Sequence, residues 1–444
     1  MATRSMLTRR QVLRDLGLAT AALGLTPMLS ARGAAEAATT VAQATPAGPA
    51  KSGVEIVYLN QSRGQAKAMT FLAEKYTKEM GVKVTIDTPG PTDYPRKLQA
   101  ASQTNTMPDI YYATNAGEMA PYYKAGLALN LKPELDRGWK KNFRPGILEL
   151  IEFKAGNPLA VPPGIYNAPW EGNSYGFLYN PALFEKAKLD PKKTPASTAE
   201  FLATLKALKA AGVGPFLVAA EFIHIFVQSY VSNYLTDDEI EATHAGRSPW
   251  KSDAYREALQ MFVDMREAGA IFNTALNQPN PQCEKSFFNV QEVAILYTGV
   301  FSIPVQVTTA PQFTAYSSFP LPKAEDAKYT PRSFGAGGKN AVIHAKGKNV
   351  DEALKFVKWL TEKEQEQVMM QMVPLVPVNP EAIDPAKILP QLKTFADQLS
   401  RIQMVPTQRT AQVNEAFVKG VQSLLLKEKT VDQVLDDVDK AQKG

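Results

Sequence analysis

The chain has very little cysteine and histidine for its length. One cysteine, Cys283, and three histidines, His224, His244 and His344, are present in 444 residues. A single cysteine excludes an intramolecular disulfide, and no base stands near Cys283 to make it a nucleophile. The histidines are scattered, without the close spacing of a metal site. We therefore expect neither a metal nor another cofactor.

Common signatures of enzymes are also scarce. The sequence contains no G-x-x-x-x-G-K-[ST] loop and no H-E-x-x-H. The glycine-rich stretch SFGAGGKNA precedes an expected strand rather than a helix, so it does not fit a phosphate-binding loop. The sequence therefore shows neither a nucleotide-binding loop nor a zinc-protease motif.

The N-terminal segment has the pattern of an export signal. Arg9 and Arg10 precede a modestly apolar run, and an A-x-A step ending at Ala37 follows. This order predicts a twin-arginine signal peptide over 1–37 with cleavage after Ala37. The apolar run is too short and too interrupted for a spanning helix, which needs roughly 20 apolar residues. The alternative is an N-terminal amphipathic helix that is never removed.

Export by this route predicts a protein that folds before it crosses the membrane and is then periplasmic, with secretion as the alternative. No cysteine follows the signal, so we expect the protein to be free rather than lipid-anchored. Removal of 1–37 takes away five Arg, one Asp and one Glu, so the formal net charge falls from +5 to +2. This balance does not favour nucleic acid, which needs a concentrated basic face. Residues 38–52, rich in Ala, Thr and Pro, are expected to form a disordered spacer.

Hydrophobic periodicity in the mature chain predicts an α/β fold. VEIVYLN, from Val54, alternates like a strand, and QAKAMTFLAEKYTKEM continues as a helix that ends at Gly81. The expected strands VKVTID and MPDIYYAT complete a β-α-β-α-β order, which is typical of a mainly parallel sheet. Later helices are marked by capping residues at Ser197, Ser252 and Asn349. The length favours two domains.

Four segments carry a family resemblance: MPDIYYATNAGEMAPYYKAGLALNL, WEGNSYGFLYNPALF, FFNVQEVAILYTG and GGKNAVIHAKGKNVDEALKFVKWL. In order and spacing they resemble the solute-binding proteins of ABC importers, and within these the sugar-binding group that includes maltose-binding protein. The resemblance covers the chain from Val54 to its end. In one departure, Val300 and Phe301 follow the Y-T-G motif where many sugar binders have a tryptophan.

The resemblance implies a two-lobed periplasmic-binding-protein fold, with each lobe a mainly parallel sheet flanked by helices and a ligand cleft between the lobes. We expect lobe 1 to comprise 53–172 plus 321–346, and lobe 2 to comprise 173–320 plus 347–444. Such a cleft lies where ligands are usually bound, and hinge closure of the lobes would bury the ligand.

The resemblance also places ligand-binding candidates on particular loops. Aromatic faces would cover the apolar side of a sugar ring, while amides, carboxylates and arginine would pair with its hydroxyls. We expect Trp170 to supply a stacking face, because Pro and Gly around it disfavour a regular element. The predicted ligand-binding residues are Asn60, Gln61, Arg63, Tyr112, Asn115, Trp170, Asn173, Tyr175, Glu221, His224, Phe301, Gly337 and Gly338.

The function implied is that of a monomeric, non-enzymatic substrate-binding component. It would capture a small solute, a sugar or oligosaccharide, and deliver it to the transmembrane permease subunits of an ABC transporter, after export by the twin-arginine translocase. One alternative is an exported carbohydrate-active enzyme, for which Glu171 and Glu221 are the candidate carboxylates. A polyamine, anion or iron carrier on the same fold is another. Iron is disfavoured because Tyr111 and Tyr112 would face opposite sides of a strand.

Overall fold

A computed structural model describes residues 53–270, 277–383, 388–405 and 410–443. The predicted signal over 1–37 and spacer over 38–52 therefore lie outside the described residues. The strands are β1 (Glu55–Leu59), β2 (Lys83–Asp87), β3 (Ile110–Tyr111), β4 (Ala168–Pro169), β5 (Gly172–Tyr179), β6 (Gly214–Val218), β7 (Val293–Gly299), β8 (Ser317–Phe319), β9 (Gly335–Gly337) and β10 (Asn340–Ile343).

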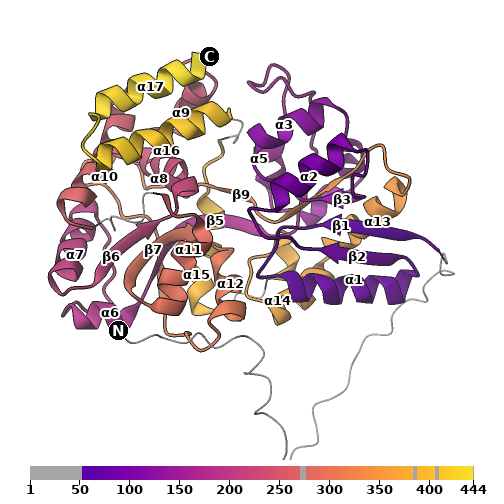
Figure 1. Cartoon of the computed structure of the whole chain (residues 1–444), viewed down its shortest axis with the longest axis horizontal. Helices are drawn as coiled ribbons and strands as arrows, with labels where there is room; N and C mark the ends of the chain where they lie inside the picture. Colours follow the sequence, from indigo (N-terminus) through magenta and orange to yellow (C-terminus); the bar gives the residue numbers. More distant parts are fainter. Residues whose placement is uncertain (1–52, 271–276, 384–387, 406–409, 444) are drawn as a thin grey trace, which may run out of the picture. The chain divides into compact units, whose positions relative to one another are not determined.

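Helices make up most of the remaining regular structure (Figure 1). The α-helices are α1 (Ala66–Met80), α2 (Tyr94–Gln103), α3 (Ala116–Lys124), α4 (Lys132–Asp136), α5 (Ile147–Ile151), α6 (Pro181–Lys186), α7 (Thr198–Ala210), α8 (Ile223–Val231), α9 (Asp237–His244), α10 (Asp253–Glu267), α11 (Asn280–Glu284), α12 (Ser302–Thr309), α13 (Val350–Leu360), α14 (Lys363–Met372), α15 (Pro390–Gln398), α16 (Ala411–Leu425) and α17 (Val431–Lys443). The shorter helices are η1 (Trp139–Asn142), η2 (Ala220–Phe222), the π-helix η4 (Lys285–Val290), η5 (Pro380–Ala382) and η7 (Leu399–Arg401).

The first sheet has the strand order β2-β1-β3-β10-β4, and with its helices it forms lobe 1. Successive strand residues pack on opposite faces: Ile110 lies in the core under α1, α13 and α14, whereas Tyr111 lies in the core under α2 and α3. The predicted helix after β1 is confirmed, and it ends at Gly81, whose φ of +69° suits glycine. Figure 1 shows α1 and α2 on opposite sides of this sheet.

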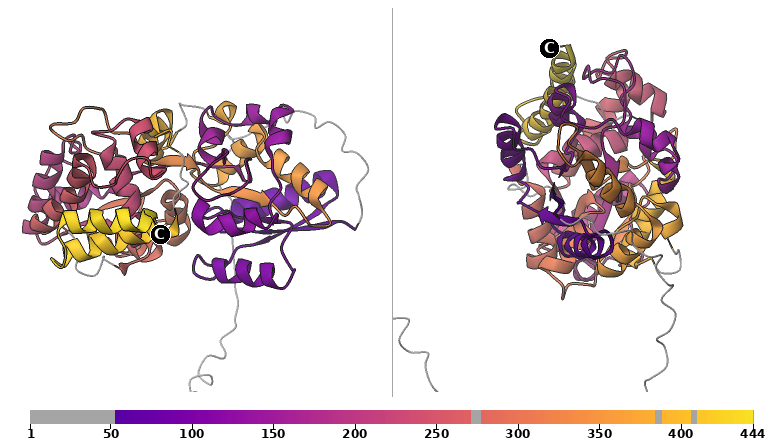
Figure 2. Two further views of the ribbon diagram at one scale, coloured as in Figure 1. Left: turned by 90° about the horizontal axis from the view of Figure 1, so that it is seen from above. Right: turned by 90° about the vertical axis from the view of Figure 1, so that its right-hand side faces the viewer.

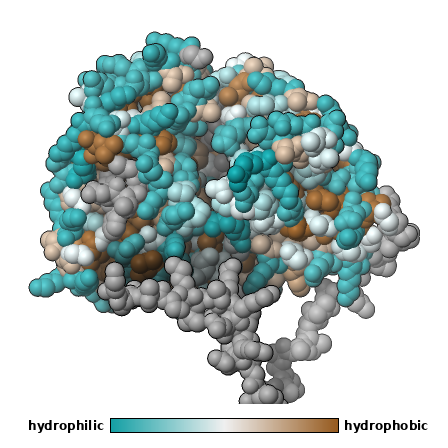
Figure 3. All heavy atoms as spheres, in the orientation of Figure 1, coloured by the Kyte–Doolittle hydropathy of each residue, from teal (hydrophilic) through white to brown (hydrophobic). Residues whose placement is uncertain are grey.

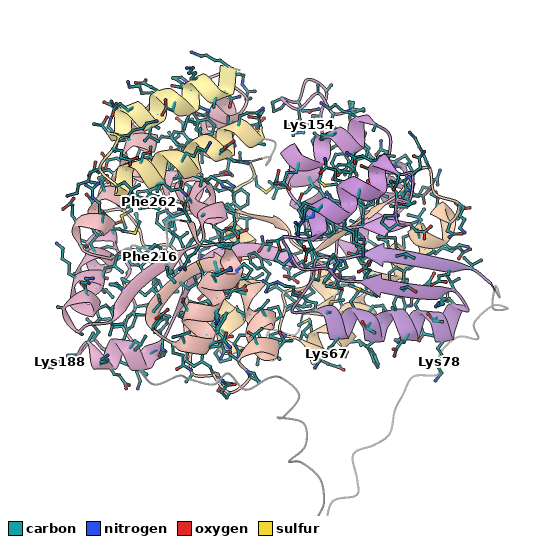
Figure 4. All side chains as sticks on the ribbon, in the orientation of Figure 1. Lys67, Lys78, Lys154, Lys188, Phe216 and Phe262 are labelled. Carbon is teal, nitrogen blue, oxygen red and sulfur yellow. The ribbon has the colours of Figure 1, made fainter. Side chains whose placement is uncertain are left out.

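The second sheet has the order β6-β7-β5-β8, with β9 also paired to β5, and with its helices it forms lobe 2. Its core is rich in aromatic side chains, and the rings of Phe177 and Phe319 stack with centroids 4.9 Å apart. Phe216 and Phe262, labelled in Figure 4, are fully buried in the same core. The C-terminal helices α16 and α17 pack on each other and on α10, and the left view of Figure 2 shows the two helices, in yellow, on lobe 2.

The α/β class and the two flanked sheets agree with the predicted fold, but the strand pairing is more mixed than the mainly parallel sheets expected. In lobe 2 only β6 and β7 pair in parallel, while β5 pairs antiparallel with β7, β8 and β9. In lobe 1, β10 runs antiparallel to β3 and β4. The antiparallel pairs form because β4, β5, β9 and β10 lie on segments that pass between the two sheets.

Two of the predicted lobe boundaries differ from the structure. We expected 347–444 in lobe 2, yet Phe356 and Leu360 of α13 and Met369 of α14 are buried in the core of lobe 1. We expected 321–346 in lobe 1, yet Leu321 and Ala324 are buried in the core of lobe 2. An amphipathic helix displays an apolar stripe without indicating which sheet it covers, so these boundaries require tertiary contacts.

The face shown in Figure 3 is mostly hydrophilic, with hydrophobic residues in small separate groups. Within the described ranges, every helix is too short or too polar to cross a bilayer.

Candidate ligand-binding cleft

A cleft of about 630 Å³ is lined by residues of both lobes and of the strands that join them. Its size falls within the roughly 300–1,000 Å³ of typical small-molecule sites. The lining residues are Gln61, Arg63, Pro91, Pro95, Tyr112, Thr114, Asn115, Glu118, Asn173, Tyr175, Glu221, Phe222, His224, Ile225, Asn280, Pro281, Phe301, Phe334, Gly337, Gly338, Lys339, Asn340, Ala411, Asn414, Glu415 and Val418.

The lobe 1 wall is built at the carboxyl ends of two parallel strands. Leu59 of β1 is opposite Tyr111 of β3, so the residues that follow both strands lie at the same edge of the sheet. Gln61, after β1, and Tyr112, after β3, therefore line the cleft together. Asn115 also lines it, although its side-chain oxygen accepts the backbone N–H of Glu118 at 3.0 Å and so caps α3.

The floor of the cleft lies where β5 pairs with β9, on the segments that pass between the two sheets. Gly337 and Gly338 line the cleft as expected, but neighbouring chain already explains why they are glycines. A Cβ on Gly337 would lie 2.2 Å from Cβ of Pro169, and one on Gly338 would lie 2.9 Å from Cβ of Asn173. Close packing of two chain segments, rather than approach of a ligand, excludes a side chain here.

Aromatic rings form the lobe 2 side of the cleft. Four of them, Tyr175, Phe222, Phe301 and Phe334, are called the aromatic cluster below. The Tyr175 ring centroid lies 5.3 Å from that of Phe222, 5.9 Å from that of Phe301 and 5.8 Å from that of Phe334. These edge-on contacts hold the rings in fixed orientations and present apolar surface to the cleft.

An ion pair joins the two lobes beside the cleft. Arg63, in the loop after β1, donates to Oε2 of Glu284 in α11 at 3.0 Å. The Glu284 side chain is 2% exposed and also accepts Nδ2 of Asn280 and Oγ of Ser302, each at 2.7 Å. The carboxylate is thus held by three donors, two of them on lobe 2, which suits a buried charge.

Lys339 lies between rings of both lobes. Its Nζ is 5.2 Å from the ring centroid of Tyr112 and 5.5 Å from that of Phe301, within cation–π range. Burial lowers the pKa of Lys339, and the nearby carboxylate of Glu171 opposes this shift. Burial also raises the pKa of Glu171 to about 7, against the effects of Lys339 and of a hydrogen bond from Gln65. Lys339 lines the cleft and donates to the carbonyl of Gln61 at 3.4 Å, and its charge is partly compensated by Glu171, which lies behind the cleft wall.

Two amide oxygens at the cleft are buried without a hydrogen-bond partner in the described part of the chain: Oδ1 of Asn173 and Oδ1 of Asn414. Asn173 and Tyr175 are two residues apart on β5, so their side chains lie on the same face of the strand beside the cleft. Buried acceptors are normally satisfied, and leaving one unpaired costs about 1–3 kcal/mol. A ligand that brings hydroxyl donors would remove this cost.

The structure brings 11 of the 13 predicted binding residues to the cleft, whereas Asn60 and Trp170 do not line it. Asn60 is fully buried and accepts the Ser62 hydroxyl at 2.7 Å. Trp170 is fully buried in the lobe 1 core, and its Nε1 donates to the Tyr58 hydroxyl at 3.1 Å. The prediction of a Trp170 stacking face is therefore wrong, because the segment is tied to β10 rather than irregular.

The carboxylates proposed for a hydrolase are engaged in structural bonds. Glu171 does not line the cleft and accepts a bond from Gln65. Glu221 lines it, but its Oε1 accepts the backbone N–H of Asn280 at 2.8 Å, at the start of α11. Among the described residues, no group of three or more His, Cys, Asp or Glu could hold a metal ion.

One short motif also fits a serine nucleophile. Residues 172–176 read GNSYG, which matches G-x-S-x-G. Ser174, however, lies inside β5 rather than on a sharp turn, is fully buried, and donates to the carbonyl of Phe395 at 2.9 Å. The motif is therefore a coincidence of strand sequence.

Sequence reasoning missed several cleft residues, notably Lys339, Asn280, Phe334 and Asn414, and the buried Glu284 beside it. Lys339 was visible in the segment GGKNA, directly after the glycines that were proposed. The other residues lie on segments whose approach to the cleft depends on contacts far apart in sequence. No local pattern could have identified them.

Comparison with known proteins gives one family and many structural neighbours. The family model described as bacterial extracellular solute-binding protein matches residues 60–367. A structure from work on xylan utilisation by Caldanaerobius polysaccharolyticus is 19% identical, with a TM-score of 0.74, covering 87% of this chain and 99% of its own. An ABC transporter solute-binding protein from Thermotoga lettingae, bound with α-D-tagatose, is 18% identical, with a TM-score of 0.73, covering 88% and 100%. A chitin oligosaccharide binding protein is 20% identical, with a TM-score of 0.71, covering 88% and 98%. No sequence among curated proteins matches the chain.

Proposed function

The chain belongs to the bacterial extracellular solute-binding proteins, and from this membership we propose that it binds a neutral carbohydrate in the cleft and delivers it to the permease of an ABC importer. The observation that carries the proposal is the lining of the cleft. The aromatic cluster offers rings for the C–H faces of a sugar, and amide side chains surround them. The unpaired oxygens of Asn173 and Asn414 suit hydroxyl donors.

The charges near the cleft support a neutral ligand over a charged one. Arg63 is already paired with Glu284, and Lys339 lies near Glu171 and between two rings. An anionic solute would have to compete with the carboxylate of Glu284 for Arg63. Breaking such a pair would leave a buried charge uncompensated, which is costly.

Structures of similar fold support the sugar class. The Thermotoga lettingae protein is described with α-D-tagatose bound, and another neighbour as binding chitin oligosaccharides. Because identities are 18% and 20%, these neighbours support the class of ligand and not a particular sugar.

We further propose that the protein reaches the periplasm by the twin-arginine route, acts there as a free monomer, and has no catalytic activity of its own. The paired Arg9 and Arg10 support the route. Closure of the two lobes on the solute would create the surface that a permease recognises.

A thermal-shift screen of the mature protein tests this function. The panel contains neutral sugars and oligosaccharides, sugar acids, polyamines and phosphate esters. We expect neutral sugars to raise the melting temperature, since a ligand at a hundredfold excess over its Kd adds about 2.7 kcal/mol. Chromatography of the incubated sugars should show no product. Stabilisation by polyamines or phosphate esters alone would contradict the proposal, and turnover of a glycan would indicate the enzyme instead.

A further inference from the structure

A second hollow of about 540 Å³ lies on lobe 1 between α2 and α3. Three of its lining residues, Pro95, Thr114 and Glu118, also line the cleft. The two hollows therefore share a border and together exceed the roughly 1,000 Å³ at the upper end of typical small-molecule sites. A single small sugar would leave the outer hollow empty.

We propose that this groove is an outer subsite that holds the far end of a linear oligosaccharide whose near end occupies the cleft. The inference rests on the proposed function and specifies its substrate class. The lining residues of α2 run from Pro95 to Gln103, a distance of eight residue steps or about 12 Å at 1.5 Å per residue. This length gives room for more than one sugar ring beyond the cleft.

The chemistry of the groove matches an uncharged sugar chain. Leu98 and Met119 form an apolar floor, while the exposed Gln99 and Gln103 stand at the rim with amide groups. Tyr122 is half-buried in the groove wall, and its ring centroid lies 6.4 Å from that of the buried Tyr111, which supports it from behind. An oriented tyrosine beside rim amides provides both the stacking face and the hydrogen-bonding groups that a pyranose ring requires.

The border with the cleft favours this occupant over a protein partner. A peptide or a second copy of the chain would cover the groove without entering the cleft. Glu118 is the only charged residue among those lining the groove, and its Oε2 accepts the Thr114 hydroxyl at 2.7 Å. The groove therefore offers almost no charged side chains for ion pairs with a charged macromolecule.

Titration calorimetry with oligosaccharides of two to six units tests the proposal, using maltose, xylose and N-acetylglucosamine series. In the wild type, affinity should rise from two units to the longer members. Tyr122→Leu, which removes the ring, should weaken the longer ligands about tenfold or more, by analogy with aromatic stacking on bases. It should leave the two-unit ligand unchanged. Tyr122→Phe keeps the ring and should restore most of the affinity for long ligands.

The control is Tyr329→Leu, which makes the same change at an exposed position of lobe 2 outside both hollows. Equal weakening of short and long ligands by Tyr122→Leu would overturn the outer subsite, and so would affinity independent of length. Either result would leave the proposed function standing. A dimer of the wild type that Tyr122→Leu dissociates would identify a second copy as the occupant and also overturn it. Binding of no member of any series would overturn both proposals.

Discussion

Replacing Trp170 with alanine is expected to destabilise lobe 1 and leave ligand affinity unchanged. The side chain is fully buried in the lobe 1 core, and its Nε1 donates to the Tyr58 hydroxyl at 3.1 Å. That hydroxyl in turn donates to the carbonyl of Asn340 at 2.6 Å. Truncating a buried Trp to Ala costs about 3–5 kcal/mol. Trp170→Phe keeps most of the packing and loses one hydrogen bond, worth about 1 kcal/mol.

Urea unfolding and ligand titration of the same variants distinguish a packing role of Trp170 from a role in ligand binding. Trp250→Ala is the matched control, because Trp250 is fully buried in the lobe 2 core and does not line the cleft. Both alanine variants should lose several kcal/mol of unfolding free energy and keep wild-type affinity in the folded fraction. The reasoning would be refuted if Trp170→Ala lost less than about 1 kcal/mol while its affinity fell and that of Trp250→Ala did not.

Three further predictions concern charged residues. A double-mutant cycle of Arg63→Ala and Glu284→Gln, measured by urea unfolding, should give a coupling free energy of about 1–2 kcal/mol, between the values for surface and buried pairs, because Arg63 is 32% exposed and Glu284 is 2% exposed. Zero coupling would count against the ion pair between the lobes. Because burial raises the pKa of Glu171 to about 7, the contribution of this group to stability should be fully present below the ordinary value of 4.5 and be lost as pH rises through 7, by at most about 3 kcal/mol. The difference in unfolding free energy between the wild type and Glu171→Gln should therefore change over this range, and a difference that does not depend on pH would exclude Glu171 as the cause. Lysines in place of Arg9 and Arg10 should retain the folded protein in the cytoplasm, and unchanged amounts in the periplasmic fraction would contradict the twin-arginine route.

Local features of the fold were predictable from sequence because each depends on neighbours in the chain. The alternating apolar residues of β1, the stripe of α1 and the left-handed Gly81 are set by segments of a few residues. The Ser197 cap is equally local, since its side chain accepts the N–H of Glu200 three residues on. Element type and boundaries follow from such patterns.

Features that depend on distant contacts were not predictable. Trp170 sits among Pro and Gly and suggests an irregular loop, yet its backbone N–H bonds to the carbonyl of Lys339, far along the chain. The partner of Arg63 is Glu284, which lies in the opposite lobe. The residues that follow parallel strands could be placed at the cleft because the topology brings strand ends together, and that rule identifies Gln61 and Tyr112 without identifying Asn414.

The central claim is that unpaired amide oxygens in the cleft accept the hydroxyls of a neutral sugar, and calorimetry of Asn173→Ala tests it most directly. The ligand is the sugar that most stabilises the wild type. Asn289→Ala is the control, because Asn289 is exposed on lobe 2 outside the cleft. Asn173→Ala loses one hydrogen bond to the ligand, worth about 0.5–1.5 kcal/mol, so its affinity for the sugar should be roughly two- to tenfold weaker than that of the wild type. The affinity of Asn289→Ala should be unchanged. Wild-type affinity in Asn173→Ala, measured on folded protein, would contradict the account.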